Sequence, residues 1–212
     1  FEGITQIVVA HRGMVDKIVG DAVHALFNAP LDQPDHPRQA LACARAIADF
    51  AEAFRNTPEA RGAGFGRTRI GLETGPAIVG DVGGSRKLDY TAHGTIVNTA
   101  ARLEAANKDF ASTIAAGARL AAACPDALWR PLGKIVLRGL AEPMLVREPW
   151  PEDASEDDRA AYQAAFDLTE KAPLAARETF AALAARRPGD AVVARWLERL
   201  IPKAGDANAS GL

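Results

Sequence analysis

The sequence predicts an α+β fold, a ferredoxin-like α/β sandwich with one mixed, mostly antiparallel sheet and its helices, followed by a small helical tail. Three observations predict it. Short strand-like segments alternate with amphipathic helical ones up to residue 148, without the regular repeat of a doubly wound sheet. Glycine-containing turns typical of hairpins separate several of these strands. After residue 149 only helical periodicity remains.

The first elements are a helix and a hairpin. Residues 1–12 have the pattern of a helix already under way, so we expect the chain to be truncated at its start. Residues 14–27 alternate in polarity around Gly20 and Asp21, which predicts a hairpin. A Gly-Asp turn is usually only a turn, because Asp tolerates tight backbone geometry. The functional alternative is a carboxylate held at the hairpin tip for a divalent cation.

The middle of the chain continues with short elements. Residues 56–67 are rich in glycine and are expected to form a linker, not a dinucleotide loop, because no strand pattern precedes them. Helices are expected at residues 38–54 and 115–123, and strands at 69–75, 76–82, 87–91, 112–114, 129–132 and 134–137, with a Gly83-Gly84 turn.

Residues 87–102 carry the clearest candidate for chemistry. A strand ending at Thr91 leads into a helix that runs to about residue 108. Asn98 and Arg102 are four residues apart, so they share a face nearly opposite the apolar stripe. An amide and a guanidinium among small residues suit an anionic ligand with hydroxyl groups. The alternative is an ordinary solvated helix face.

Composition excludes several functions. The net charge is −2 and the pI about 6.1, so no basic field favours nucleic acid or an acidic membrane. Cys43 and Cys124 are expected to be buried in a reducing compartment. No apolar run reaches the roughly 20 residues of a membrane span. We therefore expect a cytoplasmic domain without direct membrane contact.

The C-terminal part is expected to be a separate helical unit. Residues 149–158 are acidic and linker-like, residues 159–200 resemble one tetratricopeptide-like helix pair, and residues 201–212 form a disordered tail. A single pair cannot bury its own apolar face. We therefore expect it to pack on the main domain or on a partner.

Three sequence blocks resemble those of class III nucleotidyl cyclases, the adenylate/guanylate cyclase catalytic domain. Residues 15–23 resemble the Lys-x-x-Gly-Asp hairpin of the family, and residues 69–80 its glycine-rich strand and turn. Residues 90–104 match Tyr-Thr-x-x-Gly-x-x-Val-Asn-x-Ala-Ala-Arg-Leu-Glu. The resemblance covers residues 1–148 and implies the nucleotidyl cyclase fold. The wider pattern is similar to bacterial cyclases with a CHASE2-type sensor, which implies a parent protein anchored in the inner membrane.

The resemblance implies an ATP site. Lys17 would donate to the adenine N1, and Thr91 would accept from the N6 amino group. Asn98 would orient the ribose, and Arg102 would stabilise charge on the α-phosphate as the 3′-hydroxyl attacks. Arg138 would hold the β- and γ-phosphates.

The resemblance also implies two Mg²⁺ or Mn²⁺ ions and a head-to-tail homodimer with active sites at the interface. Asp21 would bind metal, and the other carboxylate is expected on a strand upstream of Phe1. Residues 1–212 alone are therefore expected to be inactive or nearly so. Two alternatives remain: a degenerate domain that binds nucleotide or a partner without turnover, and an interaction module dominated by the tail.

Overall fold

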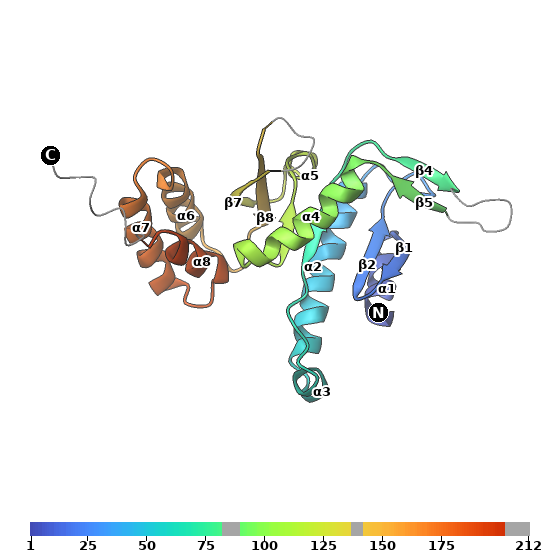
Figure 1. Cartoon of the computed structure of the whole chain (residues 1–212), viewed down its shortest axis with the longest axis horizontal. Coiled ribbons are helices and arrows are strands. Elements are labelled where there is room, and N and C mark those ends of the chain that lie inside the picture. Colours follow the sequence, from blue (N-terminus) through green and yellow to red (C-terminus); the bar gives the residue numbers. More distant parts are fainter. Residues whose placement is uncertain (82–89, 137–141, 202–212) are drawn as a thin grey trace.

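The computed structural model describes residues 1–81, 90–136 and 142–201 (Figure 1). The helices are Glu2–Ala10 (α1), His36–Arg55 (α2), Pro58–Gly62 (α3), Thr95–Phe110 (α4), Ala118–Ala123 (α5), Glu156–Leu168 (α6), Pro173–Arg186 (α7) and Ala191–Arg199 (α8). The strands are Met14–Val19 (β1), Ala22–Leu26 (β2), Ile70–Leu72 (β3), Ile78–Asp81 (β4), Tyr90–His93 (β5), Ile114–Ala116 (β6), Trp129–Ile135 (β7) and Met144–Pro149 (β8).

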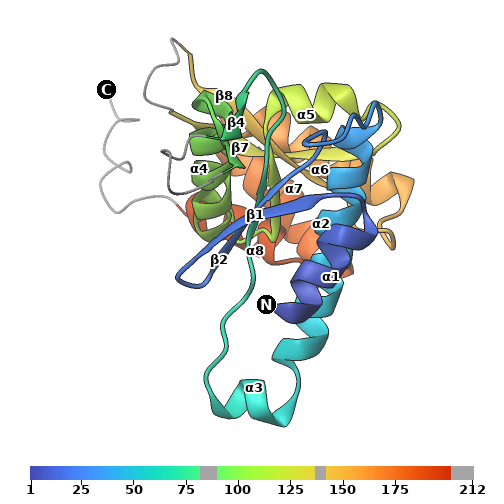
Figure 2. The same ribbon diagram turned by 90° about the vertical axis from the view of Figure 1, so that its right-hand side faces the viewer.

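The predicted α+β class is confirmed. Among the described residues the strands pair in three groups: the hairpin β1–β2, the pair β4–β5, and a sheet ordered β3-β6-β8-β7. Of the strand pairs in the described ranges, β3–β6 is parallel and the others are antiparallel. The helices α6–α8 lie at one end of the molecule and both hairpins at the other, while α3 projects beyond the end of α2 (Figures 1 and 2).

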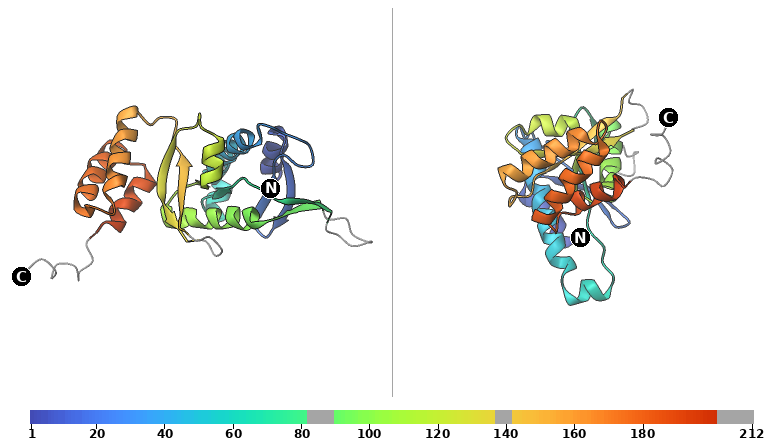
Figure 3. Two further views of the ribbon diagram at one scale, coloured as in Figure 1. Left: turned by 90° about the horizontal axis from the view of Figure 1, so that it is seen from above. Right: turned by 90° about the vertical axis from the view of Figure 1, so that its left-hand side faces the viewer.

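Helix α4 connects the two ends, as the view from above shows (Figure 3). Its buried face packs on β3 and β6 through Leu103, and the buried Asn107 amide donates to the carbonyl of Ile70 at 2.9 Å. At its C-terminal end, Arg199 of α8 donates to the Asp109 carbonyl at 2.9 Å. The two ends of the molecule are therefore linked by one helix.

The helices α6–α8, here called the helical extension, share one hydrophobic core with the sheet. Tyr162 is fully buried, and its hydroxyl donates to the Pro131 carbonyl of β7 at 2.7 Å. The shared cluster joins residues of α4 and the sheet to residues of the extension, among them Leu103, Phe110, Leu132, Val146, Trp150, Tyr162, Phe180, Leu183 and Val193. The extension thus packs on the main domain, one of the two arrangements that were expected.

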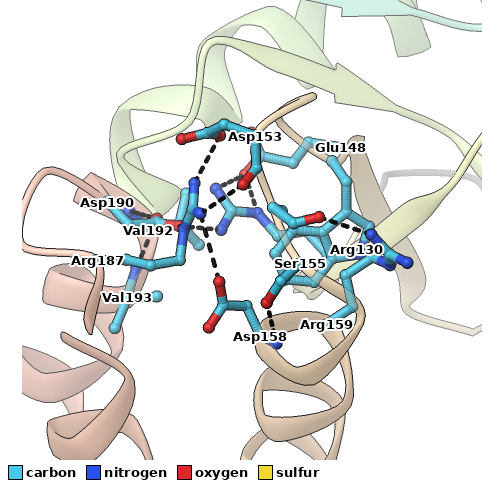
Figure 4. A network of polar contacts seen from close by, with 12 residues as sticks. Arg130, Glu148, Asp153, Ser155, Asp158, Arg159, Arg187, Asp190, Val192 and Val193 are labelled. Atoms are coloured by element: carbon cyan, nitrogen blue, oxygen red, sulfur yellow. Dashed lines mark hydrogen bonds and ion pairs between the residues drawn. The ribbon is translucent and has the colours of Figure 1, made fainter. Parts of the chain in front are cut away.

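A buried polar network crosses the same boundary (Figure 4). Arg130 of β7 pairs with Glu148 of β8 and, at 2.6 Å, with Asp190 at the start of α8. The other carboxylate oxygen of Asp190 accepts from the backbone N–H groups of Val192 and Val193, which caps α8. The extension is therefore held by charges and by apolar packing together.

Several expected boundaries are corrected by the structure. The extension has three helices instead of one pair, and α6 starts at Glu156, inside the expected linker 149–158, because Ser155 accepts from the Asp158 N–H. Residues 129–135 form one strand through an irregularity at Gly133, and it pairs with β8, which was not expected. The helix α3 begins within the expected linker 56–67 because Thr57 caps it.

Three expectations fall outside what the structure describes: the Gly83-Gly84 turn, Arg138, and the tail beyond residue 201. Within the described ranges, no helix has the length and apolar character needed to cross a bilayer.

Candidate functional site

The site is built on a β-bulge in the first hairpin. Val15 faces Ala25 and Lys17 faces His24, so Asp16 is an extra residue without a partner across the strand pair. Side chains normally alternate between the two faces of a strand, and a bulge re-aims them. The neighbouring Asp16 and Lys17 consequently approach each other, with Lys17 Nζ 3.5 Å from Asp16 Oδ2.

Asp16 gathers side chains from two hairpins. Its Oδ2 accepts a hydrogen bond from the Thr91 hydroxyl of β5 at 2.9 Å and lies 2.6 Å from His24 Nδ1 of β2. An ionised carboxylate only accepts, so His24 Nδ1 carries the hydrogen. The structure therefore brings together the predicted base-binding residues Lys17 and Thr91, with Asp16 between them.

The Asp16 carboxylate is wholly buried, and its Oδ1 has no hydrogen-bond partner among the residues that the structure describes. Burial is the largest influence on its pKa and raises it, but hydrogen bonds from His24 and Thr91 and the nearby positive charges outweigh burial and lower the pKa overall. Thr91 is 1% exposed, whereas the Lys17 side chain is 43% exposed. Lys17 is thus the accessible member of the predicted base-binding pair.

The helix α4 presents Asn98 and Arg102 as predicted. Both are exposed, while Leu103 on the opposite side is fully buried. Gly71 of β3 permits the close approach of this helix, since an added Cβ would lie 2.0 Å from the Ala100 carbonyl oxygen. Among the described residues neither the Asn98 nor the Arg102 side chain has an ion pair or a side-chain hydrogen bond, so both groups are available to a ligand or a partner.

Asp21 occupies the exposed tip of the hairpin, where Gly20 adopts a φ of +61°. Within the described parts of the chain, no three His, Cys, Asp or Glu side chains gather as metal ligands would. A single exposed carboxylate is a poor site for Mg²⁺, which prefers several oxygen ligands. These residues therefore do not fit a two-metal site by themselves, and the metal role of Asp21 stays a prediction.

The sequence-based assignment missed Asp16 and His24. The available signal was an acidic residue beside Lys17 in an otherwise apolar strand. That signal does not reveal the bulge, and without the bulge Asp16 would face away from Lys17. The role predicted for Arg138 lies outside the described residues.

Comparisons with known proteins agree with this architecture. A family model described as "Adenylate and Guanylate cyclase catalytic domain" matches residues 2–144. "Adenylate cyclase 1" of Rhizobium meliloti is 40% identical over 140 residues, which cover 66% of this chain and 21% of that protein. An uncharacterized protein of Mycobacterium tuberculosis is 36% identical over 154 residues, 70% of this chain and 26% of that one. The chain thus spans about a fifth to a quarter of these curated relatives.

Solved structures show the same fold. The adenylyl cyclase CyaB from P. aeruginosa superposes with a TM-score of 0.61 at 27% identity, covering 74% of this chain and 80% of that one. A bacterial light-regulated adenylyl cyclase superposes with a TM-score of 0.60 at 28% identity, covering 70% and 42%. Given these matches and the three sequence blocks, the chain belongs to the family of adenylate and guanylate cyclase catalytic domains.

Proposed function

We propose that the protein is an adenylate cyclase, which converts ATP to 3′,5′-cyclic AMP and pyrophosphate. The observation that carries this proposal is the meeting of Lys17 and Thr91 at Asp16. A donor and a hydroxyl side by side suit the adjacent N1 and 6-amino positions of adenine. The relative named "Adenylate cyclase 1" supports the same nucleotide.

In this proposal the chain acts chiefly by positioning the nucleotide. Lys17 donates to the adenine N1, and Thr91 accepts from the amino group. Asn98 orients the ribose so that its 3′-hydroxyl lies in line with the α-phosphate, and orientation of this kind lowers the barrier substantially. Arg102 stabilises the negative charge that builds on the α-phosphate oxygens, and Arg138 holds the terminal phosphates.

Mg²⁺ or Mn²⁺, when bound, would lower the pKa of the attacking hydroxyl and neutralise phosphate charge. Asp21 is the residue of this chain proposed to contribute to that site. Because no group of metal-binding side chains lies around Asp21 among the described residues, further ligands would come from elsewhere, for example from the nucleotide phosphates or another chain.

We also propose that two copies form a head-to-tail homodimer with active sites at their interface. The exposed Asn98 and Arg102 support this arrangement. Within the described parts of the chain their side chains make no ion pair or side-chain hydrogen bond, so they can meet a nucleotide held by a second copy. The similarity to CHASE2-type cyclases further leads us to propose that the domain lies on the cytoplasmic side of an inner-membrane protein.

The experiment is production of cyclic AMP from Mn²⁺-ATP, with Mn²⁺-GTP for comparison. It is run on residues 1–212 and on the longest natural protein that contains them. We expect the longer protein to turn over ATP faster than GTP. In Lys17→Glu the ratio of the ATP rate to the GTP rate should fall, because the carboxylate places an acceptor opposite the guanine N1–H. Nucleotide binding without turnover would favour the second candidate function, a degenerate domain. The lack of a metal-ligand group around Asp21 among the described residues also favours that candidate. Preference for GTP would contradict the proposal.

A further inference from the structure

The buried carboxylate of Asp16 stands between two residues of the proposed base site and has no assigned role of its own. We propose that Asp16 is a positioning residue that sets purine selectivity: it fixes the Thr91 hydroxyl as an acceptor and thereby selects a 6-amino purine over a 6-oxo purine. This inference rests on the proposed function and deepens it, because it names the group that decides between ATP and GTP.

The argument begins with the single hydrogen of the Thr91 hydroxyl. A hydroxyl has one hydrogen to donate and two lone pairs to accept. The ionised Asp16 carboxylate can only accept, so at 2.9 Å it takes that hydrogen. Adenine carries an amino donor at C6, whereas guanine carries a carbonyl acceptor there. The remaining lone pairs of Thr91 therefore attract the amino group of ATP and repel the oxygen of GTP.

The environment of Asp16 keeps this arrangement in place. His24 Nδ1 at 2.6 Å and Lys17 Nζ at 3.5 Å both face Asp16 Oδ2 and favour its charged form. Within residues 1–81, 90–136 and 142–201, the buried Oδ1 has no hydrogen-bond partner, which is unusual for a buried polar atom. The Asp16–Thr91 pair therefore offers no spare donor to a 6-oxo group.

Lys17 and Thr91 differ in their exposure to a ligand. Thr91 is 1% exposed, while the Lys17 side chain is 43% exposed and rotates about four carbon–carbon bonds. N1 and the 6-substituent are neighbours on the purine ring. A purine whose N1 accepts a hydrogen bond from Lys17 would therefore direct its 6-substituent toward Thr91. The bulge at Asp16 is what places both contacts on one side of the hairpin, and bulges of this kind are frequent next to functional sites.

The test uses the isosteric Asp16→Asn variant. Its amide can donate to Thr91 Oγ1, so the hydroxyl hydrogen becomes free to meet a 6-oxo group. We expect the ratio of ATP to GTP affinity to fall by about tenfold, the size of one directed hydrogen bond. Affinity is measured in the whole chain by competition of ATP and GTP against a fluorescent ATP analogue. Asp32→Asn, an exposed carboxylate on the loop after β2, is the matched control and should leave the ratio unchanged.

A double-mutant cycle separates positioning from a general structural effect. Thr91→Val removes the hydroxyl but keeps the side-chain shape. The double variant Asp16→Asn/Thr91→Val should therefore have the same ratio of ATP to GTP affinity as Thr91→Val alone. Should Asp16→Asn fail to fold, Thr91→Ser is expected to retain the ratio and Thr91→Val to lower it. An unchanged ratio in Asp16→Asn or Thr91→Val overturns the inference.

The outcomes distinguish this inference from the function on which it rests. If wild type prefers ATP and the variants do not alter the preference, only the role of Asp16 is wrong. If wild type prefers GTP, or binds neither nucleotide, both the role of Asp16 and the adenylate cyclase proposal are wrong. In the protein that turns over nucleotide, Asp16→Asn should lower the ratio of kcat/KM for ATP to kcat/KM for GTP.

Discussion

Arg130 Nη1 lies 2.6 Å from Asp190 Oδ2, which ties strand β7 to the first turn of helix α8 across 60 residues of sequence. The Arg130 side chain is 5% exposed and the Asp190 side chain 4%, so the pair is shielded from solvent. The same guanidinium lies over the rings of Trp150 and Tyr162, 5.0 and 5.3 Å from their centroids. One cation thus organises the junction between the sheet and the helical extension.

We predict that Arg130→Met strongly destabilises the protein. The variant keeps part of the apolar stem of Arg130 but removes the guanidinium that pairs with the buried Glu148 and Asp190. Removing one partner of a buried ion pair costs about 3–5 kcal/mol, because an uncompensated charge remains. Urea unfolding followed by circular dichroism measures the loss. Arg177→Met, at an exposed position of α7, is the control and should change stability little; equal losses in both variants would refute a central role for Arg130.

The same network predicts an unusual dependence of stability on pH. Burial raises the pKa of Glu148 from 4.5 to about 7, although the charge of Arg130 opposes the rise. Between pH 4.5 and about 7, Glu148 therefore keeps its proton in the folded protein, whereas the same side chain has lost its proton in the unfolded chain. The resulting contribution to the free energy of unfolding is fully present below pH 4.5, the pKa of Glu148 in the unfolded chain. It is lost as the pH rises through the folded pKa of about 7.

Wild type should therefore lose more unfolding free energy between about pH 5 and about pH 8 than Glu148→Gln does. Glutamine has nearly the same shape as glutamate but does not titrate. The difference between the two proteins in their loss of unfolding free energy therefore reports the protonation of Glu148. Urea titrations at the two pH values measure it. Parallel losses in both proteins would mean that Glu148 is already ionised at the lower pH.

Local patterns allowed much of the fold to be predicted, but not its junctions. The hairpin β1–β2 and helix α4 followed from periods of two and 3.6 residues, which depend only on neighbouring residues. The pairing of Arg130 with Asp190 joins positions far apart in sequence, and no local pattern encodes it. The strand β8 was missed because its short apolar stretch Met144–Val146 runs straight into charged Arg147 and Glu148.

The candidate site was predictable to a similar degree. Resemblance supplied Lys17 and Thr91, and their proximity in the structure agrees with a shared task. Asp16 was not predictable, because its orientation depends on a one-residue register shift that leaves no mark in composition or periodicity. The short helix α3 was predictable in principle, since Thr57 before Pro58 is a helix-start signal that the surrounding glycines obscured.

We predict that Gly71→Ala displaces helix α4. The added Cβ would lie 2.0 Å from the Ala100 carbonyl oxygen and 2.4 Å from the Glu104 nitrogen, and these backbone atoms cannot rotate away. Strain of this kind costs about 1–3 kcal/mol or more. Thermal unfolding should show a clearly lower Tm, and in an active form cyclase turnover should fall with it, because α4 carries Asn98 and Arg102.

Gly62→Ala is the matched control. Its Cβ would meet no atom of the described residues within 4 Å apart from those of its own helix and chain neighbours. The residue lies in helix α3, so the substitution is expected to be neutral or to stabilise by about 0.4–1 kcal/mol. If Gly71→Ala were as stable as Gly62→Ala, the close approach of α4 to β3 would not be a constraint on the fold.

Arg102→Ala is predicted to abolish most cyclase activity without destabilising the protein. The side chain is exposed and, within the described residues, makes no ion pair or hydrogen bond, so the folded state loses little when it is truncated. In the proposed reaction its guanidinium meets charge that appears on the α-phosphate only in the transition state. Loss of one such group typically lowers kcat by about 100-fold or more while KM changes much less.

The measurement pairs cyclic AMP production from Mn²⁺-ATP with thermal unfolding of the same preparations. Lys108→Ala, an exposed cation on the last turn of α4, is the control for charge and should keep both activity and Tm. A fall in Tm with Arg102→Ala would point to a structural role instead. Equal kcat in the Arg102→Ala and Lys108→Ala variants would remove Arg102 from the reaction and leave α4 as a scaffold for the sheet.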